Sequence, residues 1–299
     1  MNGTTKKGGT YLKNKSDEKP SEKQLIKLRD YKVVKANNLI QKSRFELSLQ
    51  EQKIVLYLIS KIKPDDEEFK EHTFKIQDFC KVCGIDYDNG KNYKNIKDTI
   101  KKLADKSLWV KVGNKEILLR WINEAEINDL SGTIMLKIHE KMKPYLLQLQ
   151  KHFTEYELLY TLAMKSQYSI RIYELLKSYG NLYIVTFDIE GLKRMLSAEN
   201  YKLYGDFKRK VLDISLQEIN ELSDIKVTYE TIKEGRKFIK LKFLISLKKD
   251  FSERIQTWQR INEIISPPKD FEDLERHLLG RDNEAAATRE EKEEEECMN

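Results

Sequence analysis

The sequence predicts an α+β fold made of two copies of one module, because the same order of elements occurs twice. Residues 48–140 and 155–250 each run through an amphipathic helix, a short strand, a small helix, a basic helix and a β-hairpin. Three pairs of segments align at offsets of 116, 113 and 111, namely Ile54–Tyr57 with Ile170–Tyr173, Phe74–Phe79 with Phe187–Leu192, and Tyr93–Lys97 with Tyr204–Lys208. This order is that of a winged helix-turn-helix, so we predict tandem winged helix-turn-helix domains.

The charge distribution favours a polyanionic partner. The chain has 299 residues, enough for two domains, and its 39% of hydrophobic residues can build two modest cores. The net charge is +6, but the segment from Gly280 onward carries eight acids and three bases, so residues 1–279 carry +11. A basic body is typical of a protein that binds nucleic acid. We expect the acidic end to solubilise the chain; the alternative is that it mimics DNA and screens the basic surface.

Several other classes of protein are disfavoured. The three cysteines, Cys80, Cys83 and Cys297, give no disulfide framework, and no apolar run reaches the ~18 residues of a membrane span, so we expect a cytoplasmic protein without membrane contact. Cys80 and Cys83 lack a second pair to complete a zinc site, so neither metal nor cofactor is expected. The four histidines form no His-x-His pair and there is no phosphate-binding loop, which argues against a nickase and an ATPase. A carboxylate-based nuclease site is the remaining enzymatic alternative.

The elements of the first module follow from local signals. Ser48 and Glu51 have the spacing of a capping box, and the helix that they begin ends before Pro64. Gly84 ends the small helix, and Gly113-Asn114 supplies the turn of a hairpin. The other expected elements are a strand at 31–35, a strand at 72–76, a small helix at 77–82, a basic helix at 92–106, hairpin strands at 108–112 and 116–122, and a third strand at 133–138.

The second module follows a leucine-rich helix that begins at Pro144 and is predicted to join the two domains. Its expected elements are a helix ending at 178, a strand at 182–187, a short helix at 189–196, a basic helix at 206–222, and hairpin strands at 225–232 and 237–247. The predicted domains are therefore a disordered basic arm at 1–30, a winged-helix domain at 31–143, a second winged-helix domain at 144–265, and a disordered acidic tail at 266–299.

The basic helix of the second module is the strongest candidate for DNA binding. At 100° per residue, Phe207, Val211, Ile214 and Leu222 form its buried face and Arg209 points away from them. Arginine can bind guanine O6 and N7 together, whereas lysine neutralises phosphate. The candidate residues are Lys202, Lys208, Arg209 and Lys210 on or before this helix, with Lys233, Arg236 and Lys237 at the hairpin tip. The alternative is an ordinary solvated cationic face.

The equivalent helix of the first module carries only lysines, which supply charge without the geometry for base recognition. They are Lys91, Lys94, Lys101 and Lys102. We therefore expect the first module to contact phosphates or to support dimerisation, and the second to specify the DNA sequence. The alternative is that these lysines only keep the chain soluble.

Three segments resemble a known family. They are Val34–Ile40 (VKANNLI), Ser166–Lys177 (SQYSIRIYELLK) and Tyr204–Asn220 (YGDFKRKVLDISLQEIN), and the last is followed by a short strand and a glycine-containing wing. In this order they resemble the initiator Rep proteins of iteron-type, theta-replicating plasmids, over about residues 30–250. Nothing in that family matches the tail after Pro268.

The resemblance implies tandem winged helices that bind directly repeated double-stranded origin DNA without catalysis. Monomers would bind the repeats, dimers would repress their own promoter, and a host replication initiator and helicase would be recruited. It also implies that Lys208, Arg209 and Lys210 read the groove, and that Arg171 contacts phosphate or anchors Glu174. Asp213, four residues after Arg209, departs from a base-contacting pattern. The alternatives are a winged-helix transcription regulator and a rolling-circle nickase.

Overall fold

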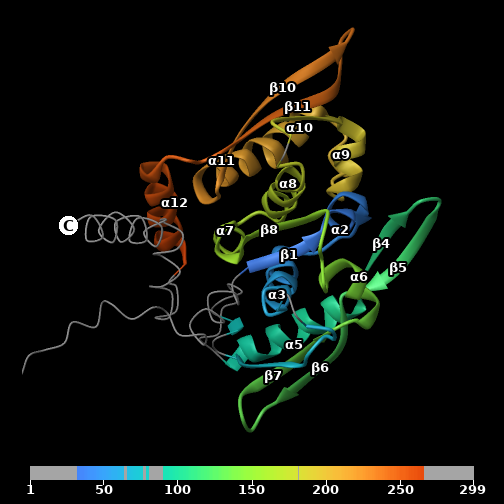
Figure 1. The fold of residues 1–299 in the computed structure, drawn as a ribbon, viewed down its shortest axis with the longest axis vertical. Helices are drawn as coiled ribbons and strands as arrows, with labels where there is room; N and C mark the ends of the chain where they lie inside the picture. The colour runs from blue at the N-terminus through green and yellow to red at the C-terminus, as the bar shows by residue number, and fades with distance from the viewer. Residues whose placement is uncertain (1–31, 64–65, 77–78, 81–89, 181, 266–299) are drawn as a thin grey trace, which may run out of the picture.

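The computed structural model describes residues 32–63, 66–76, 79–80, 90–180 and 182–265. In Figure 1 the first module lies below and the second above, with strands β1 (Lys32–Ala36) and β8 (Phe153–Glu157) between them. The expected basic arm, the acidic tail, Cys83 and Cys297 lie outside the described residues. Within those residues, no helix is both long and apolar enough to cross a membrane.

The first module begins with a helix whose start was predicted correctly. Ser48 accepts a hydrogen bond from the Glu51 amide at 3.3 Å, and the Glu51 carboxylate accepts one from the Ser48 amide at 2.7 Å, which completes the capping box. The small helix expected at 77–82 lies mostly outside the described residues. The other elements up to the basic helix are α2 (Asn37–Lys42), β2 (Ser43–Arg44), α3 (Leu49–Ile59), β3 (His72–Lys75) and α5 (Gly90–Asp105).

Two hairpins follow α5, and the structure corrects the predicted identity of the wing. The hairpin around Gly113 consists of β4 (Ser107–Val112) and β5 (Lys115–Arg120), and it pairs with β2. The next hairpin, β6 (Ile122–Asn128) and β7 (Thr133–Ile138), pairs with β3. In the second module too, the strand before the small helix (residues 184–188) pairs with the second strand of the hairpin. The β6–β7 hairpin is therefore the wing of the first module, and β4–β5 is an additional hairpin. The third strand predicted at 133–138 is present as β7, and it pairs with β6 and β3.

The joint between the modules is a two-stranded sheet. After 3₁₀ helix η1 (Glu140–Met142), the predicted leucine-rich helix is only the short α6 (Lys143–Leu146). Strand β8 then runs antiparallel to β1, and α7 (Leu158–Ala163) follows. The sheet therefore contains one strand from each predicted domain. Val33 and Tyr156 are paired across it, and both are buried.

The second module closely follows the predicted order. Its first elements are α8 (Gln167–Ser178), β9 (Ile184–Asp188) and α9 (Ile189–Met195). The basic helix consists of α10 (Tyr204–Phe207), the π-helical turn η2 (Lys208–Leu212) and α11 (Asp213–Leu222). The long strands β10 (Ile225–Glu234) and β11 (Lys237–Leu247) form the wing, with β9 on the other side of β11, and α12 (Phe251–Ile264) packs beside α11.

The internal repeat predicted from sequence corresponds to equivalent core positions. Ile76 and Ile189 are both buried where strand gives way to helix, and Ile96 and Phe207 are both buried on the basic helices. The buried apolar side chains of the two modules form one continuous cluster. The modules are therefore held together by shared apolar packing as well as by the β1–β8 sheet.

Candidate nucleic-acid interface

The basic helix of the second module is fixed in place by two polar anchors on its inner side. Glu218 accepts hydrogen bonds from the backbone amides of Lys165 and Ser166, at 3.1 and 3.2 Å, at the start of α8. Asn220 makes a reciprocal pair with the backbone of Val227 in β10, at 3.0 and 2.7 Å. These contacts set the position of the helix relative to both α8 and the wing.

The π-helical turn changes which residues of this helix face the core. The amide of Asp213 donates to the carbonyl of Lys208, five residues earlier, so one extra residue is inserted into the turn. Val211 and Leu212 are both buried, and the buried face then continues at positions 215, 216, 219 and 222. The prediction that Ile214 belongs to the buried face is therefore wrong, because it assumed α-helical spacing throughout; the Ile214 side chain is 44% exposed.

The predicted DNA-reading residues lie on the outward side of this turn. Lys208, Arg209 and Lys210 are all exposed, and the Arg209 side chain is 73% accessible. Each of the first two pairs with an acid of the same helix: Lys208 Nζ lies 2.8 Å from Asp213, and Arg209 lies 3.0 Å from Asp206. These pairs were not predicted, although the spacing of the acids around the basic run could have indicated them.

The wing tip lies close to the start of the basic helix through a stack of aromatic rings. Phe238 of β11 stacks on Tyr204 of α10 with ring centroids 4.3 Å apart, and Lys233 Nζ lies 4.5 Å from the Phe238 ring. Lys233, Arg236 and Lys237 are exposed around the turn at Gly235, which has φ +59°. Lys202 is exposed two residues before α10. The structure thus gathers these predicted residues on one basic surface, which we call the helix–wing surface.

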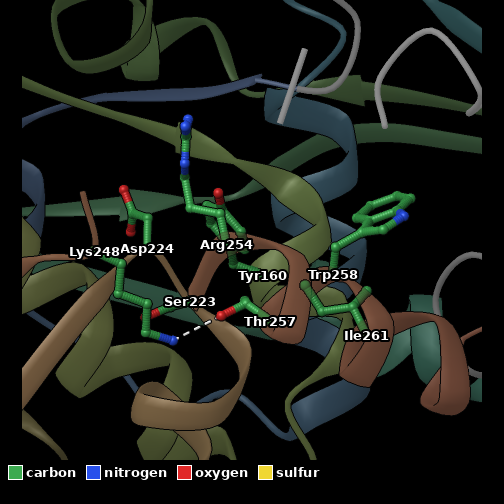
Figure 2. A pocket seen from close by; sticks show the side chains of 8 residues that line it. All are labelled: Tyr160, Ser223, Asp224, Lys248, Arg254, Thr257, Trp258 and Ile261. Carbon is green, nitrogen blue, oxygen red and sulfur yellow. Dashed lines mark hydrogen bonds between the residues drawn. The ribbon is translucent and has the colours of Figure 1, made fainter. Parts of the chain in front are cut away.

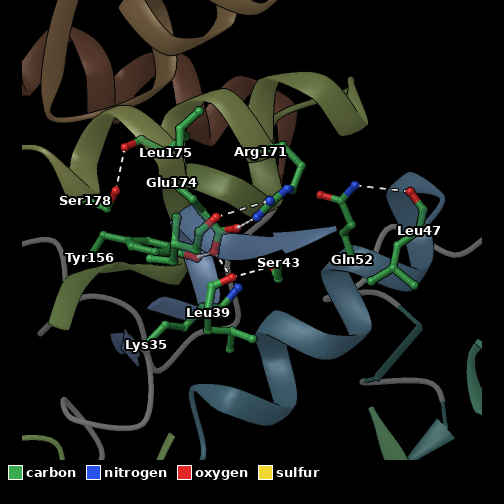
Figure 3. Close-up of polar contacts among 11 residues, drawn as sticks. Lys35, Leu39, Ser43, Leu47, Gln52, Tyr156, Arg171, Glu174, Leu175 and Ser178 are labelled. Carbon is green, nitrogen blue, oxygen red and sulfur yellow. Dashed lines mark hydrogen bonds and ion pairs between the residues drawn. The ribbon is translucent and has the colours of Figure 1, made fainter. Parts of the chain in front are cut away.

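Arg171 lies apart from that surface, in the interior between the modules (Figure 3). Its guanidinium pairs with Glu174 at 3.5 Å and lies 4.3 Å from the Phe45 ring. Lys35 of β1 also contacts Glu174 at 2.5 Å, and the Tyr156 hydroxyl donates to the same carboxylate. Because Arg171 is buried, it does not contact phosphate. Its role in the structure is the other one that was predicted, the anchor to Glu174.

In the first module, the lysines of α5 are accessible. Lys94, Lys101 and Lys102 are exposed, opposite the buried Ile96, Ile100 and Leu103. The side chain of Lys91 is outside the described residues. Lys97, on the same helix, lies 3.4 Å from Asp129 in the turn of the β6–β7 wing. The helix and wing of this module therefore contact each other, as they do in the second module.

The other polar cluster of the second module has a structural role. A small cavity between α12, α7 and the segment that follows α11 is lined by Tyr160, Ser223, Asp224, Lys248, Arg254, Thr257, Trp258 and Ile261 (Figure 2). Its volume is only about 10 Å³, room for about one water molecule. Lys248 donates to the Asn220 carbonyl at 2.5 Å and to the Thr257 hydroxyl at 2.8 Å, and burial lowers its pKa to about 8. These bonds tie α12 to the end of the basic helix.

Metal ligands do not cluster in the described part of the chain, where no group of three or more His, Cys, Asp or Glu side chains could hold an ion. Cys80 is buried, and this burial raises the pKa of its thiol to about 11.

Comparison with known proteins gives family matches over most of the chain. A family model described as "Initiator Replication protein, WH1" matches residues 32–177, and one described as "Initiator Rep protein, WH2" matches residues 188–245. The first match extends past the domain boundary that we predicted at 143/144 and includes β8 and α8.

Individual relatives agree with these matches. A replication initiation protein of Escherichia coli is 30% identical over 230 residues, covering 72% of this chain and 69% of the relative. An uncharacterized 27.6 kDa protein of Escherichia coli is 24% identical, and the match covers 69% of this chain and 92% of that protein. The crystal structure of Pi initiator protein in complex with iteron DNA shows the same fold, with a TM-score of 0.57 at 22% identity. The match covers 74% of this chain and 99% of that one. The chain therefore belongs to the family of plasmid initiator Rep proteins with tandem winged-helix domains.

Proposed function

We propose that this protein starts plasmid replication by binding directly repeated origin DNA with both of its winged-helix modules. The observation that carries the proposal is the helix–wing surface of the second module, where an exposed arginine and several lysines project from a firmly anchored helix and its wing. A helix of about this size fits the major groove, and a basic wing suits the neighbouring phosphates. The family and the fold shared with an initiator bound to iteron DNA support this proposal.

The two modules would divide the work. Arg209 supplies the geometry that reads guanine, so the second module would specify sequence. The exposed lysines of α5 supply charge alone, so the first module would bind phosphates and add affinity. Because the β1–β8 sheet joins the modules, the two helices would engage DNA at a fixed spacing.

The additional hairpin of the first module supports self-association. Trp109 and Leu118 are directly opposed on its outer face, and they are 48% and 50% exposed. In the β2–β4–β5 sheet, β5 is the edge strand. We propose that this hairpin joins two copies of the chain in a dimer that represses transcription, whereas the monomer binds origin repeats. Recruitment of a host initiator and helicase, rather than a reaction catalysed by the chain, would then open the origin.

Footprinting on the DNA that flanks the protein's own gene, at two protein concentrations, tests the function. We expect protection of several direct repeats, spaced by about two helical turns beside an AT-rich stretch, with an inverted repeat protected at the higher concentration. Protection of an operator alone, without repeats, would indicate a transcription regulator instead. A metal-dependent nick in supercoiled origin DNA would indicate a nickase.

A further inference from the structure

The exposure of Ile214 is the least expected feature of the helix–wing surface. A branched apolar side chain faces solvent on a helix whose other outward residues, such as Lys210, Asp213 and Gln217, are polar. Simple α-helical spacing would bury it beside Val211. The π-helical turn rotates the following residues, so Ile214 moves outward while Ser215 takes a buried position.

The same turn sets Ile214 on the outward side of the helix, where Arg209 is also exposed. Residues five apart lie about 140° apart around an α-helix, on different faces. Across η2, however, Lys208 and Asp213 are five apart and their side chains meet at 2.8 Å. Arg209 and Ile214 form the next pair with that separation, and both are exposed. The turn therefore places a guanidinium and an apolar side chain on the same outward strip of the helix.

We propose that Ile214 determines specificity by contacting the C5-methyl group of a thymine, in a base pair next to the one read by Arg209. The thymine methyl is the apolar group that base pairs present in the major groove, and apolar side chains read it by direct contact. The polar neighbours of Ile214 fit a groove better than a protein interface, whose centre would be more widely apolar. This assignment rests on the proposed function, since it requires that α11 enters DNA.

The test uses the full-length protein and removes one methyl group from the DNA. Duplexes that bind the wild type are first selected from a random-sequence library, and each thymine of the selected site is then replaced by uracil. At one or two positions, the replacement should weaken wild-type binding about fourfold, the effect of one buried methyl group. Ile214→Ala should bind the thymine and uracil duplexes equally, and Ile214→Val should keep part of the difference.

Leu247→Ala is the matched control, because Leu247 is similarly exposed but lies at the far end of β11 from the wing tip. It should retain the full thymine preference. If Ile214→Ala keeps that preference, or if no thymine methyl affects wild-type binding, the assignment is wrong. If the wild type selects no sequence from the library, the proposed function fails and the assignment fails with it.

Discussion

At the scale of single residues, two basic groups of the helix–wing surface are paired with carboxylates before any DNA is bound. Lys208 pairs with Asp213 and Arg209 with Asp206, and all four side chains are well exposed. Exposed pairs of this kind contribute about 0–1 kcal/mol, so DNA can replace them at little cost. The acids should nevertheless repel phosphates in a wrong register, which favours specific over non-specific binding.

Asp213→Asn should therefore raise affinity for random DNA. The change removes one negative charge from the surface and frees Lys208, so we expect binding to random duplex to tighten by up to about fivefold, or about 1 kcal/mol. Titration of a labelled random duplex measures this. Glu263→Gln removes a more exposed, paired acid on α12 and should change nothing. Equal effects of the two variants would mean that only net charge matters.

Glu157 makes the stability of the joint between the modules depend on pH. Burial, partly opposed by Lys32 and reinforced by Glu155 and Asp224, raises the pKa of Glu157 from 4.5 to about 7. The folded state then binds the proton more tightly than the unfolded chain. Protonation of Glu157 therefore stabilises the folded state. This stabilisation is complete below pH 4.5 and is lost as the pH rises through 7.

The neutral variant Glu157→Gln should remove this dependence. Relative to the wild type, its free energy of unfolding should be unchanged near pH 4 and higher by at most about 3 kcal/mol near pH 8. Urea denaturation at both pH values measures the difference, with Glu230→Gln, which removes an exposed and ion-paired acid on β10, as control. A difference between variant and wild type that is the same at both pH values contradicts the shifted pKa.

At the scale of elements, the sequence predicts what depends on local chemistry. The Ser48 capping box, the repeated buried positions Ile76 and Ile189, and the order of helices and strands all follow from nearby residues. Two predictions fail for definite reasons. The position of Ile214 depends on a π-helical turn, which a 100° periodicity cannot represent. The identity of the first wing depends on which hairpin pairs with the distant β3, a choice made by tertiary packing.

The additional hairpin has a pattern in its sequence that predicts an exposed apolar face. Leu108–Val110 and Ile117–Leu119 are apolar on both faces of the hairpin, whereas a strand with one solvated face alternates. The inner residues Leu108 and Leu119 are buried, which leaves Trp109 and Leu118 outside.

Leu118→Lys should disrupt self-association, because it places a charge at the centre of the proposed dimer surface. We expect the dimer dissociation constant to rise at least about tenfold in sedimentation equilibrium. Leu130→Lys is the control, since Leu130 is fully exposed in the turn of the other hairpin of the same module. If both variants associate like the wild type, the dimer forms elsewhere.

At the scale of the whole molecule, a buried ionic cluster fastens the two modules together. Lys35 comes from β1, and Arg171 and Glu174 come from α8, which lies beyond the boundary that we predicted between the two domains. Burial alone would raise the pKa of Glu174, but Lys35 and Arg171 together lower it below its ordinary value, so the carboxylate stays charged. Unlike apolar contacts, such a cluster is directional, and the loss of one partner leaves the others charged and buried without a counterion.

Glu174→Gln should destabilise the fold by about 3–5 kcal/mol at pH 7, because two buried cations lose their counterion. Urea denaturation measures the loss, and the exposed Glu155→Gln should cost much less. A variant as stable as the wild type would show that the cluster does not hold the modules together.

The central claim, that the second module reads sequence while the first binds phosphates, is tested most directly by binding across a salt series. Arg209→Ala should lose about 1–3 kcal/mol of discrimination between selected and random duplex. Lys94→Ala combined with Lys101→Ala should weaken binding to both duplexes alike. It should also lower the slope of log affinity against log salt concentration by about 2 units. Equal weakening of both duplexes by Arg209→Ala, or an unchanged salt slope for the double variant, would contradict the account.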